Sequence, residues 1–255
     1  MVELKTPREI ALLREAGRVV AEALAAVHER AEVGITLAEL DRLAAKVIDK
    51  AGATPAFLGY RPSWAPTPYP GVICASVNDA VVHGIPGRTR LANGDLVSID
   101  CGAFLRGWCG DAAISFIVGE HRPADVELIA ATDAALARGI EAARPGRQLG
   151  DVGNAIGLPV RQAGYGLLAD HGGHGVGRAM HEDPFVHNEG RPGHGFRIRP
   201  GLVIALEPML IADGTDDYLT DRDGWSLRTA SGSRAAHSEH TIAVTDDGPV
   251  ILTDR

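Results

Sequence analysis

Cysteine is scarce in this sequence, and no CxxC pair occurs. The 255 residues include only Cys74, Cys101 and Cys109. Three cysteines cannot all pair with one another, and unpaired thiols are the rule in the reducing cytoplasm. We therefore expect free thiols and a cytoplasmic protein rather than a secreted one held by disulfides.

Long hydrophobic runs are also missing. No apolar stretch reaches the roughly 18 residues of a membrane-spanning helix, and the opening MVELKTPREIALL lacks a signal-peptide core. Positive charge is in the minority, with 25 lysines and arginines against 33 acidic residues, a net charge of −8. These absences argue against membrane attachment and against a stable nucleic-acid complex, although Arg191–Pro200 forms one local basic segment.

Several catalytic signatures are absent as well. No nucleophile elbow or phosphate-binding loop occurs, and the glycines of HGGHGVG follow no clear strand, which weakens a dinucleotide site. No linker or low-complexity segment divides the chain. We therefore expect a single domain over residues 1–255.

What the sequence does contain is helical periodicity in pairs. Thr6 with Glu9, and Thr36 with Glu39, predict the capped starts of two helices. A second long helix is expected over 124–143, again followed by a shorter one. Short apolar runs between and after these helices predict strands.

The second half of the chain echoes the first. Gly146 and its helix match Gly34 at an offset of 112 residues, and GLVIALEP (201–208) matches GDLVSIDC (94–101) at an offset of 107. Two nearly equal offsets favour a diverged duplication over chance similarity. We expect two helix–helix–sheet halves, related by a pseudo-two-fold axis, that share one sheet.

Four acids stand in or beside apolar strand-like runs. Asp100 ends LVSID, Asp111 begins DAAISFIV, Glu207 ends LVIALE and Glu239 precedes HTIAV. For any one of them, a strand-end residue facing water is the simpler interpretation. Four together predict a cluster, and buried carboxylates cost several kcal/mol unless a positive partner holds them.

A pair of divalent cations would supply that positive charge. The stretch HGGHGVGRAMHEDP adds His171, His174 and His181 as candidate imidazole ligands. Carboxylates with one imidazole suit Mn, Fe, Co or Zn(II), whereas structural zinc favours thiolates. Two ions about 3.5–4 Å apart lower the pKa of a bound water to about 7 and polarise a carbonyl, which predicts hydrolysis of an amide.

These motifs together resemble the type I methionine aminopeptidases. The resemblance spans nearly the whole chain, in segments that include SVNDAVVHGIPG, GDLVSIDCG, GWCGDAAISF, HGGHGVGRAMHEDP, IRPGLVIALEPM, DGWSLRT and SEHTIAVT. It implies an α+β protein of the pita-bread (creatinase/aminopeptidase) fold, in which pseudo-two-fold halves share an antiparallel sheet with helices on one face. The absence of a large insertion between His181 and Glu207 disfavours the type II form.

The resemblance further implies two divalent metal ions, with Co, Mn, Fe and Zn all open, and five ligands. Asp111 and Glu239 would bridge both ions, Asp100 would hold one ion, and His174 and Glu207 would hold the other.

Three residues would carry the catalysis. Glu207 would move a water proton, His181 would donate to the scissile carbonyl, and His83 would contact the peptide nitrogen. A hydrogen-bonded loop or core histidine is the alternative for each imidazole. His171 and His187 match no ligand position, and we expect a packing residue and an exposed residue, respectively.

The substrate pocket implied by the resemblance accepts an unbranched thioether side chain. Its lining would be Phe57, Tyr60, Tyr69, Cys74 and Trp225. The alternative is that these aromatics only cap the core. Three features depart from the family pattern. The loop Arg61–Pro70 is longer and adds Trp64, Phe57 is bulky where the family often has a small residue, and His237 and Ser238 stand where an amide and an aromatic are expected.

The implied function is removal of the initiator methionine from nascent proteins whose second residue is small. Partners would be nascent N-termini and, transiently, the ribosome; a monomer is expected. One alternative is a proline-directed pita-bread peptidase, which usually carries an additional N-terminal domain. Another is a non-catalytic pita-bread binding module, which typically loses metal ligands that this sequence retains.

Overall fold

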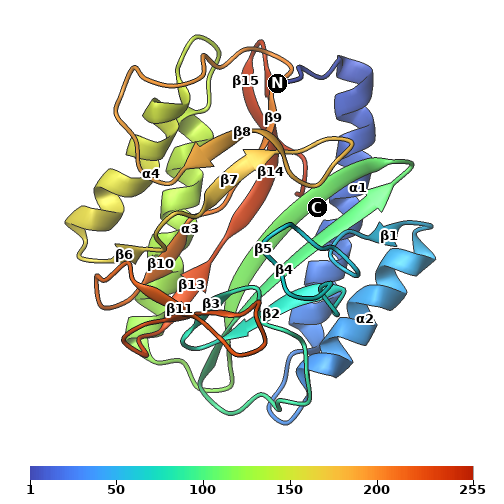
Figure 1. The fold of residues 1–255 in the computed structure, drawn as a ribbon, viewed down its shortest axis with the longest axis vertical. Helices are drawn as coiled ribbons and strands as arrows, with labels where there is room; N and C mark the ends of the chain where they lie inside the picture. The colour runs from blue at the N-terminus through green and yellow to red at the C-terminus, as the bar shows by residue number, and fades with distance from the viewer. Residues whose placement is uncertain (255) are drawn as a thin grey trace.

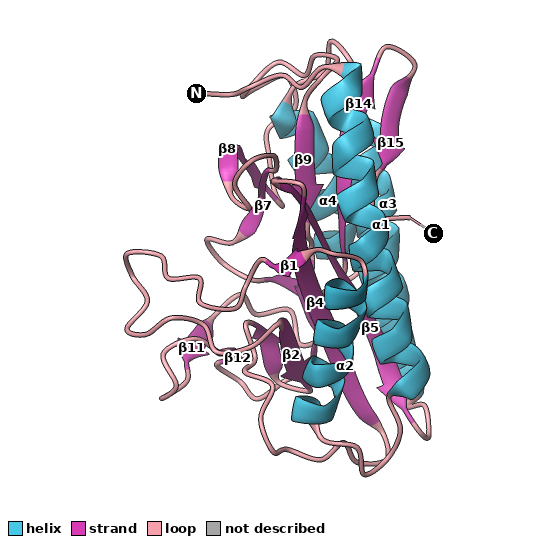
Figure 2. Cartoon of the chain, turned by 90° about the vertical axis from the view of Figure 1, so that its right-hand side faces the viewer, coloured by secondary structure: helices cyan, strands magenta, loops and turns pink. Residues whose placement is uncertain are grey.

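The computed structural model describes residues 1–254. Helices pack on one face of a curved sheet, and long loops gather on the opposite face (Figure 1, Figure 2). The helices are α1 (Pro7–Arg30), α2 (Leu37–Lys50), α3 (Pro123–Ala142) and α4 (Leu149–Gln162).

The main sheet has nine strands in the order β1-β4-β5-β14-β9-β7-β8, with β15 beside β14 and β2 beside β4, and all its pairs are antiparallel. Its strands are β1 (Thr54–Pro55), β2 (Ile73–Val77), β4 (Asp95–Leu105), β5 (Trp108–Val118), β7 (Gly172–Gly175), β8 (Glu182–His187), β9 (Val203–Leu206), β14 (Glu239–Thr245) and β15 (Gly248–Ile251). Two small sheets flank it. One consists of β6 (Gly166–Leu167), β10 (Met209–Ile211) and β13 (Ala235–His237). The other consists of β3 (Ala80–Val82), β11 (Tyr218–Thr220) and β12 (Leu227–Thr229).

Both predicted capping boxes are confirmed. The Thr6 and Thr36 side chains accept from the backbone N–H groups of Glu9 and Glu39, and each glutamate accepts from the backbone N–H of its threonine. Such caps satisfy N–H groups that a helix start leaves unpaired, and each contributes about 1 kcal/mol.

The duplication is visible in matching backbone features. Isolated β-bridges join Thr36 to Arg90 in the first half and Gln148 to Arg197 in the second, each just before a short helix. These pairs repeat the two offsets found in the sequence. The halves meet along β5 and β14, so the sheet is continuous across the pseudo-two-fold axis.

Each half has its own apolar core between its helices and the sheet. The three cysteines are buried and free, as expected. Within residues 1–254, no helix is both long and apolar enough for a membrane crossing.

Candidate active site

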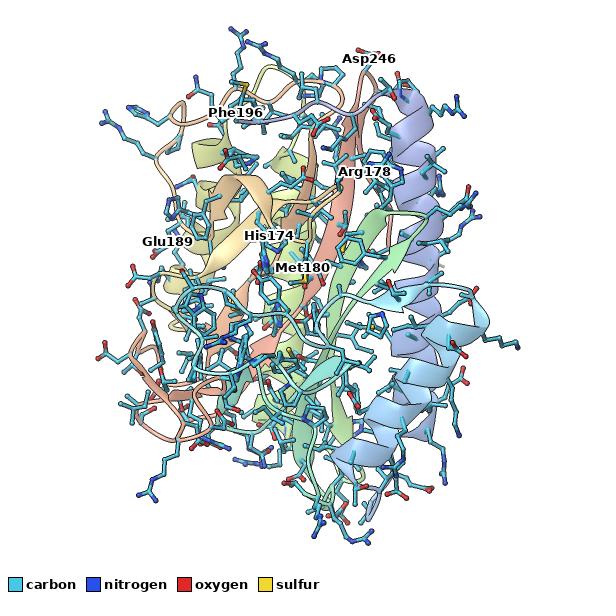
Figure 3. All side chains as sticks on the ribbon, turned by 45° about the vertical axis from the view of Figure 1, so that its right-hand side comes forward. His174, Arg178, Met180, Glu189, Phe196 and Asp246 are labelled. Atoms are coloured by element: carbon cyan, nitrogen blue, oxygen red, sulfur yellow. The ribbon has the colours of Figure 1, made fainter. Side chains whose placement is uncertain are left out.

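A cavity of about 760 Å³ opens where the two halves meet. Its wall contains all the residues that the sequence assigns to metal binding, catalysis and substrate recognition. They are Phe57, Tyr60, Tyr69, Cys74, His83, Asp100, Asp111, His174, His181, Glu207, Trp225 and Glu239. Figure 3 shows His174 and Met180, two of the lining residues, near the middle of the molecule.

Strand register brings three of the acids to one face of the sheet. In the β4–β5 hairpin, Asp100 lies opposite Ala113 and Asp111 lies opposite Gly102; Glu239 of β14 also pairs with Ala113. Residues two apart on a strand share a face. The hairpin that carries two aspartates therefore presents both of them to the cavity, beside Glu239.

Gly102 provides the space for this arrangement. A Cβ at this position would lie 2.8 Å from Cε1 of Phe57 and 3.3 Å from Oδ1 of Asp111. A side chain here would push the pocket wall against the carboxylate. The Thr241 hydroxyl donates to the backbone carbonyl of Asp111 at 2.7 Å, which fastens β5 to β14 at the level of the acids.

The second half contributes His174 and Glu207. His174 lies on β7 and Glu207 directly follows β9, and His174 Nε2 is 3.5 Å from Glu207 Oε1 and 3.9 Å from Asp111 Oδ2. The ring Nδ1 lies 3.0 Å from the carbonyl oxygen of Gly175, so Nδ1 carries the proton and the Nε2 lone pair faces the carboxylates. Ligand atoms of Asp111, His174 and Glu239 all lie within 4.8 Å of one another.

The hydrogen-bonding state of the acids fits a metal centre. Buried oxygens of Asp100 (Oδ1), Asp111 (Oδ1) and Glu239 (Oε1) lack any hydrogen-bond partner among the described residues. Burial raises the pKa of Asp100 to about 7. Burial, and then repulsion by neighbouring carboxylates, raises the pKa of Asp111 and of Glu239 well above the ordinary range. Divalent cations would satisfy these oxygens and neutralise the repulsion.

Two further histidines in the cavity are held neutral. Burial lowers the pKa of His83 to about 4, and it also lowers the pKa of His181. The Tyr60 hydroxyl lies 3.1 Å from Nδ1 of His181, and the ring of His181 lies 4.2 Å from that of His174, centroid to centroid. With Tyr60 as the donor, Nε2 of His181 carries a proton that can be donated into the cavity.

The aromatic part of the cavity forms a closed apolar recess. Phe57, Tyr69 and Trp225 are 7%, 2% and 3% exposed, and their rings meet edge to face. Cys74 is buried beside them, and burial raises its thiol pKa, so the thiol remains a neutral lining group. Tyr69 donates to the carbonyl of Gly84 at 2.8 Å, which leaves no unpaired polar group on this ring.

Residues outside the predicted set behave in different ways. His171 lines the cavity with Nδ1 2.7 Å from the Ala169 carbonyl oxygen, and His187 is exposed on β8. His237, which departs from the family pattern, also belongs to the site. Its ring is buried, and Nε2 lies 3.8 Å from Glu207 Oε2. Met180 also lines the cavity. The one feature of the sequence that could have indicated this is its position next to His181.

This fold and site define a class of protein. The model of metallopeptidase family M24 matches residues 11–246, so the chain is an M24 metallopeptidase. Within that class it belongs to the methionine aminopeptidases. It is 50% identical over 260 residues to methionine aminopeptidase 1 of Mycobacterium tuberculosis, covering 99% of this chain and 95% of that protein. It is 42% identical over 253 residues to methionine aminopeptidase 1 of Bacillus subtilis, covering 99% of each.

Solved structures agree. A crystal structure of a methionine aminopeptidase from Thermotoga maritima superposes with a TM-score of 0.95 at 40% identity, with full coverage of both chains. Prolidase from Pyrococcus furiosus superposes with a TM-score of 0.79 at 22% identity, covering 99% of this chain and 65% of that one. The prolidase likeness shows a shared pita-bread fold, and the expected fold class is confirmed.

Proposed function

We propose that this protein removes the initiator methionine from nascent proteins whose second residue is small. The observation that carries the proposal is the placement of a five-residue acid and imidazole cluster next to a closed apolar recess, in one cavity. A free amino group can bind at the carboxylates while an unbranched side chain fills the recess. This arrangement selects both the chain end and the residue to be removed.

The ligands we propose for two divalent ions are Asp100, Asp111, His174, Glu207 and Glu239. Asp111 and Glu239 lie on the adjacent strands β5 and β14, between the other ligands, and would contact both ions. Asp100 would hold one ion, and His174 with Glu207 would hold the other. When bound, such ions acidify water and polarise a carbonyl. The donor set admits Co, Mn, Fe or Zn.

Proton movements fall to the chain's own side chains. Glu207 lines the cavity and would accept a water proton, because bound divalent cations would keep its carboxylate ionised near neutral pH. His181, held neutral with its proton on Nε2, would donate to the carbonyl oxygen as that oxygen gains negative charge. His83 would contact the peptide nitrogen of the bond that breaks.

A peptide panel tests the substrate class. We expect Met-Ala-Ser to be cleaved about 100-fold faster, in kcat/KM, than Val-Ala-Ser, because the recess is shaped for an unbranched chain. Ala-Pro-Ser should be a poor substrate. Preference for Ala-Pro-Ser would favour a proline-directed peptidase, and a metal-loaded protein that cleaves none of the three would favour a binding module.

We also propose that the enzyme is a cytoplasmic monomer that docks transiently on ribosomes. One chain supplies the whole cavity, and its three free, buried thiols suit a reducing compartment. Two neighbouring loops, joined by the Gln148–Arg197 bridge, present an exposed basic face on a protein of net charge −8. The arginines of this face are Arg144, Arg147, Arg191, Arg197 and Arg199.

Docking through this face would depend on salt. We expect the wild type to sediment with ribosomes at low salt and to be released as salt rises, because phosphate contacts displace counterions. A variant carrying Arg191→Glu, Arg197→Glu and Arg199→Glu should remain in the supernatant yet cleave Met-Ala-Ser normally. Sedimentation of this variant at the wild-type level would contradict the assignment of the face.

A further inference from the structure

The loop between Tyr60 and Tyr69 is a built feature of the cavity mouth. Its base is closed by two backbone hydrogen bonds, Tyr69 N to Tyr60 O and Gly59 N to Tyr69 O, each 2.8 Å long. The indole N–H of Trp225 donates to the Thr67 carbonyl at 3.1 Å, and Arg61 donates to the Pro66 carbonyl at 3.1 Å.

Two small residues complete this anchorage. Ala65 is 5% exposed, and a Cβ at Gly224 would lie 2.4 Å from Cγ of Pro66, so the loop sits tightly on the 224–225 turn. Pro62, Pro66 and Pro68 restrict the backbone further. The loop therefore presents its remaining large side chain, Trp64, in a defined place.

Trp64 ends a row of aromatic rings that runs from the recess to the surface. Phe57 meets Tyr69 with centroids 6.4 Å apart, Tyr69 meets Trp225 at 5.0 Å, and Trp225 meets Trp64 at 5.0 Å. The first three are buried, whereas Trp64 is 59% exposed and still lines the cavity. One face of this indole is therefore free at the mouth.

The row also passes the residue proposed to contact the scissile bond. The Trp64 ring lies nearly parallel to that of His83, at 27°, with centroids 6.3 Å apart. If the amino end of the substrate is held at the carboxylates and its side chain fills the recess, the rest of the peptide can leave past His83 and over Trp64. An extended chain advances about 3.3–3.6 Å per residue. The third residue of the substrate therefore lies about 6 Å beyond the scissile nitrogen, which is similar to the distance between the His83 and Trp64 rings.

We propose that Trp64 is a specificity-determining residue that recognises the third residue of the substrate. The second residue is small, so the third is the first that can place a large side chain against the indole. The substrates favoured are peptides of the form Met-small-aromatic or Met-small-aliphatic. This inference rests on the proposed methionine aminopeptidase activity and adds a second recognition point to it.

The test compares Met-Ala-Phe-amide with Met-Ala-Gly-amide in the full, metal-loaded enzyme. An aromatic contact of this kind corresponds to about a 3–10-fold difference in kcat/KM. The wild type should show this preference, Trp64→Phe should keep most of it, and Trp64→Ala should reduce it to less than about twofold. The preference is the ratio of the two kcat/KM values within each protein, so a loss common to both tripeptides, which Met-Ala-amide measures separately, does not change it.

Matched controls separate the possible failures. Leu158→Ala removes another exposed apolar side chain, 51% exposed against 59% for Trp64, from α4, outside the cavity, and should leave the preference intact. If Trp64→Ala retains the full preference, or if the wild type has none while it cleaves Met-Ala-amide, the inference is overturned and the proposed function stands. If the wild type cleaves no methionyl peptide, the proposed function itself fails and the inference falls with it.

Discussion

Replacing Asp111 with asparagine should reduce cleavage of Met-Ala-Ser by more than about 100-fold, beyond the 10–100-fold typical of residues that only support metal ligands. The change keeps the size of the side chain and removes its charge. Asp111 is buried, has an oxygen without a partner, and lies within 4.8 Å of ligand atoms on both His174 and Glu239. Loss of this one carboxylate therefore affects both proposed ions. Cleavage assays and the metal content of the purified protein should fall together.

Asp41→Asn provides a matched control. Asp41 is a partly buried carboxylate, but it accepts backbone hydrogen bonds from Val72 and Ile73 and lies outside the cavity lining. An asparagine oxygen can accept the same bonds, so activity and metal content should stay near wild type. Comparable losses in both variants would mean that the Asp111 effect is general destabilisation.

Removal of divalent metal should make the stability of the protein fall steeply as pH rises from about 6.5 to 8. Burial raises the pKa of Asp100 to about 7, and burial with repulsion by neighbouring carboxylates raises the pKa values of Asp111, Glu207 and Glu239 well above their ordinary values. In this range the folded, metal-free protein holds protons on these carboxylates that the unfolded chain, with pKa values near 4, has lost. Stability therefore decreases as pH rises through the folded pKa values.

The lower bound of this range comes from the histidines. Burial lowers the pKa of His83 to about 4, and of His174 and His237 to about 3. Below about pH 6.5 the unfolded chain protonates these imidazoles and the folded protein does not, which destabilises the fold as pH falls. Above that pH they are neutral in both states, and the carboxylates dominate.

Thermal denaturation measures the effect. Each carboxylate that titrates contributes up to about 1.4 kcal/mol per pH unit, which corresponds to about 3–6 °C in Tm for a chain of this size. Saturating metal should raise Tm and flatten or reverse the slope, because metal binds the deprotonated ligands. Without metal, Asp111→Asn should be more stable than wild type at about pH 8, since asparagine needs no proton uptake on folding. A metal-free wild type whose Tm is constant over this range would contradict the account.

Local signals in the sequence predicted much of the framework. Thr6 with Glu9 and Thr36 with Glu39 bond as the capping pattern requires, because these contacts join residues three apart. Alternation correctly placed Asp100 on the face opposite its apolar neighbours Val97 and Ile99, which pack in the first core. The repeat offsets likewise predicted two halves around one sheet.

Features that depend on distant contacts could not be predicted from residue patterns. The buried ammonium group of Lys5 donates hydrogen bonds to the carboxylates of Glu3 and Glu182, each 2.9 Å long. Glu182 is 177 residues away in the chain, so no local pattern indicates this contact. The residue pattern of HGGHGVG indicates no strand, whereas His174 lies on β7, which pairs with β8 and β9. Glycine-rich strands lack the side-chain alternation that identifies a strand.

The most direct test is a crystal structure of the manganese-loaded enzyme, with anomalous data collected near the metal absorption edge. The account predicts two peaks about 3.5–4 Å apart in the cavity between the halves, with carboxylate oxygens of Asp111 and Glu239 in contact with both. A single ion, or two ions that share neither of these side chains, would contradict it.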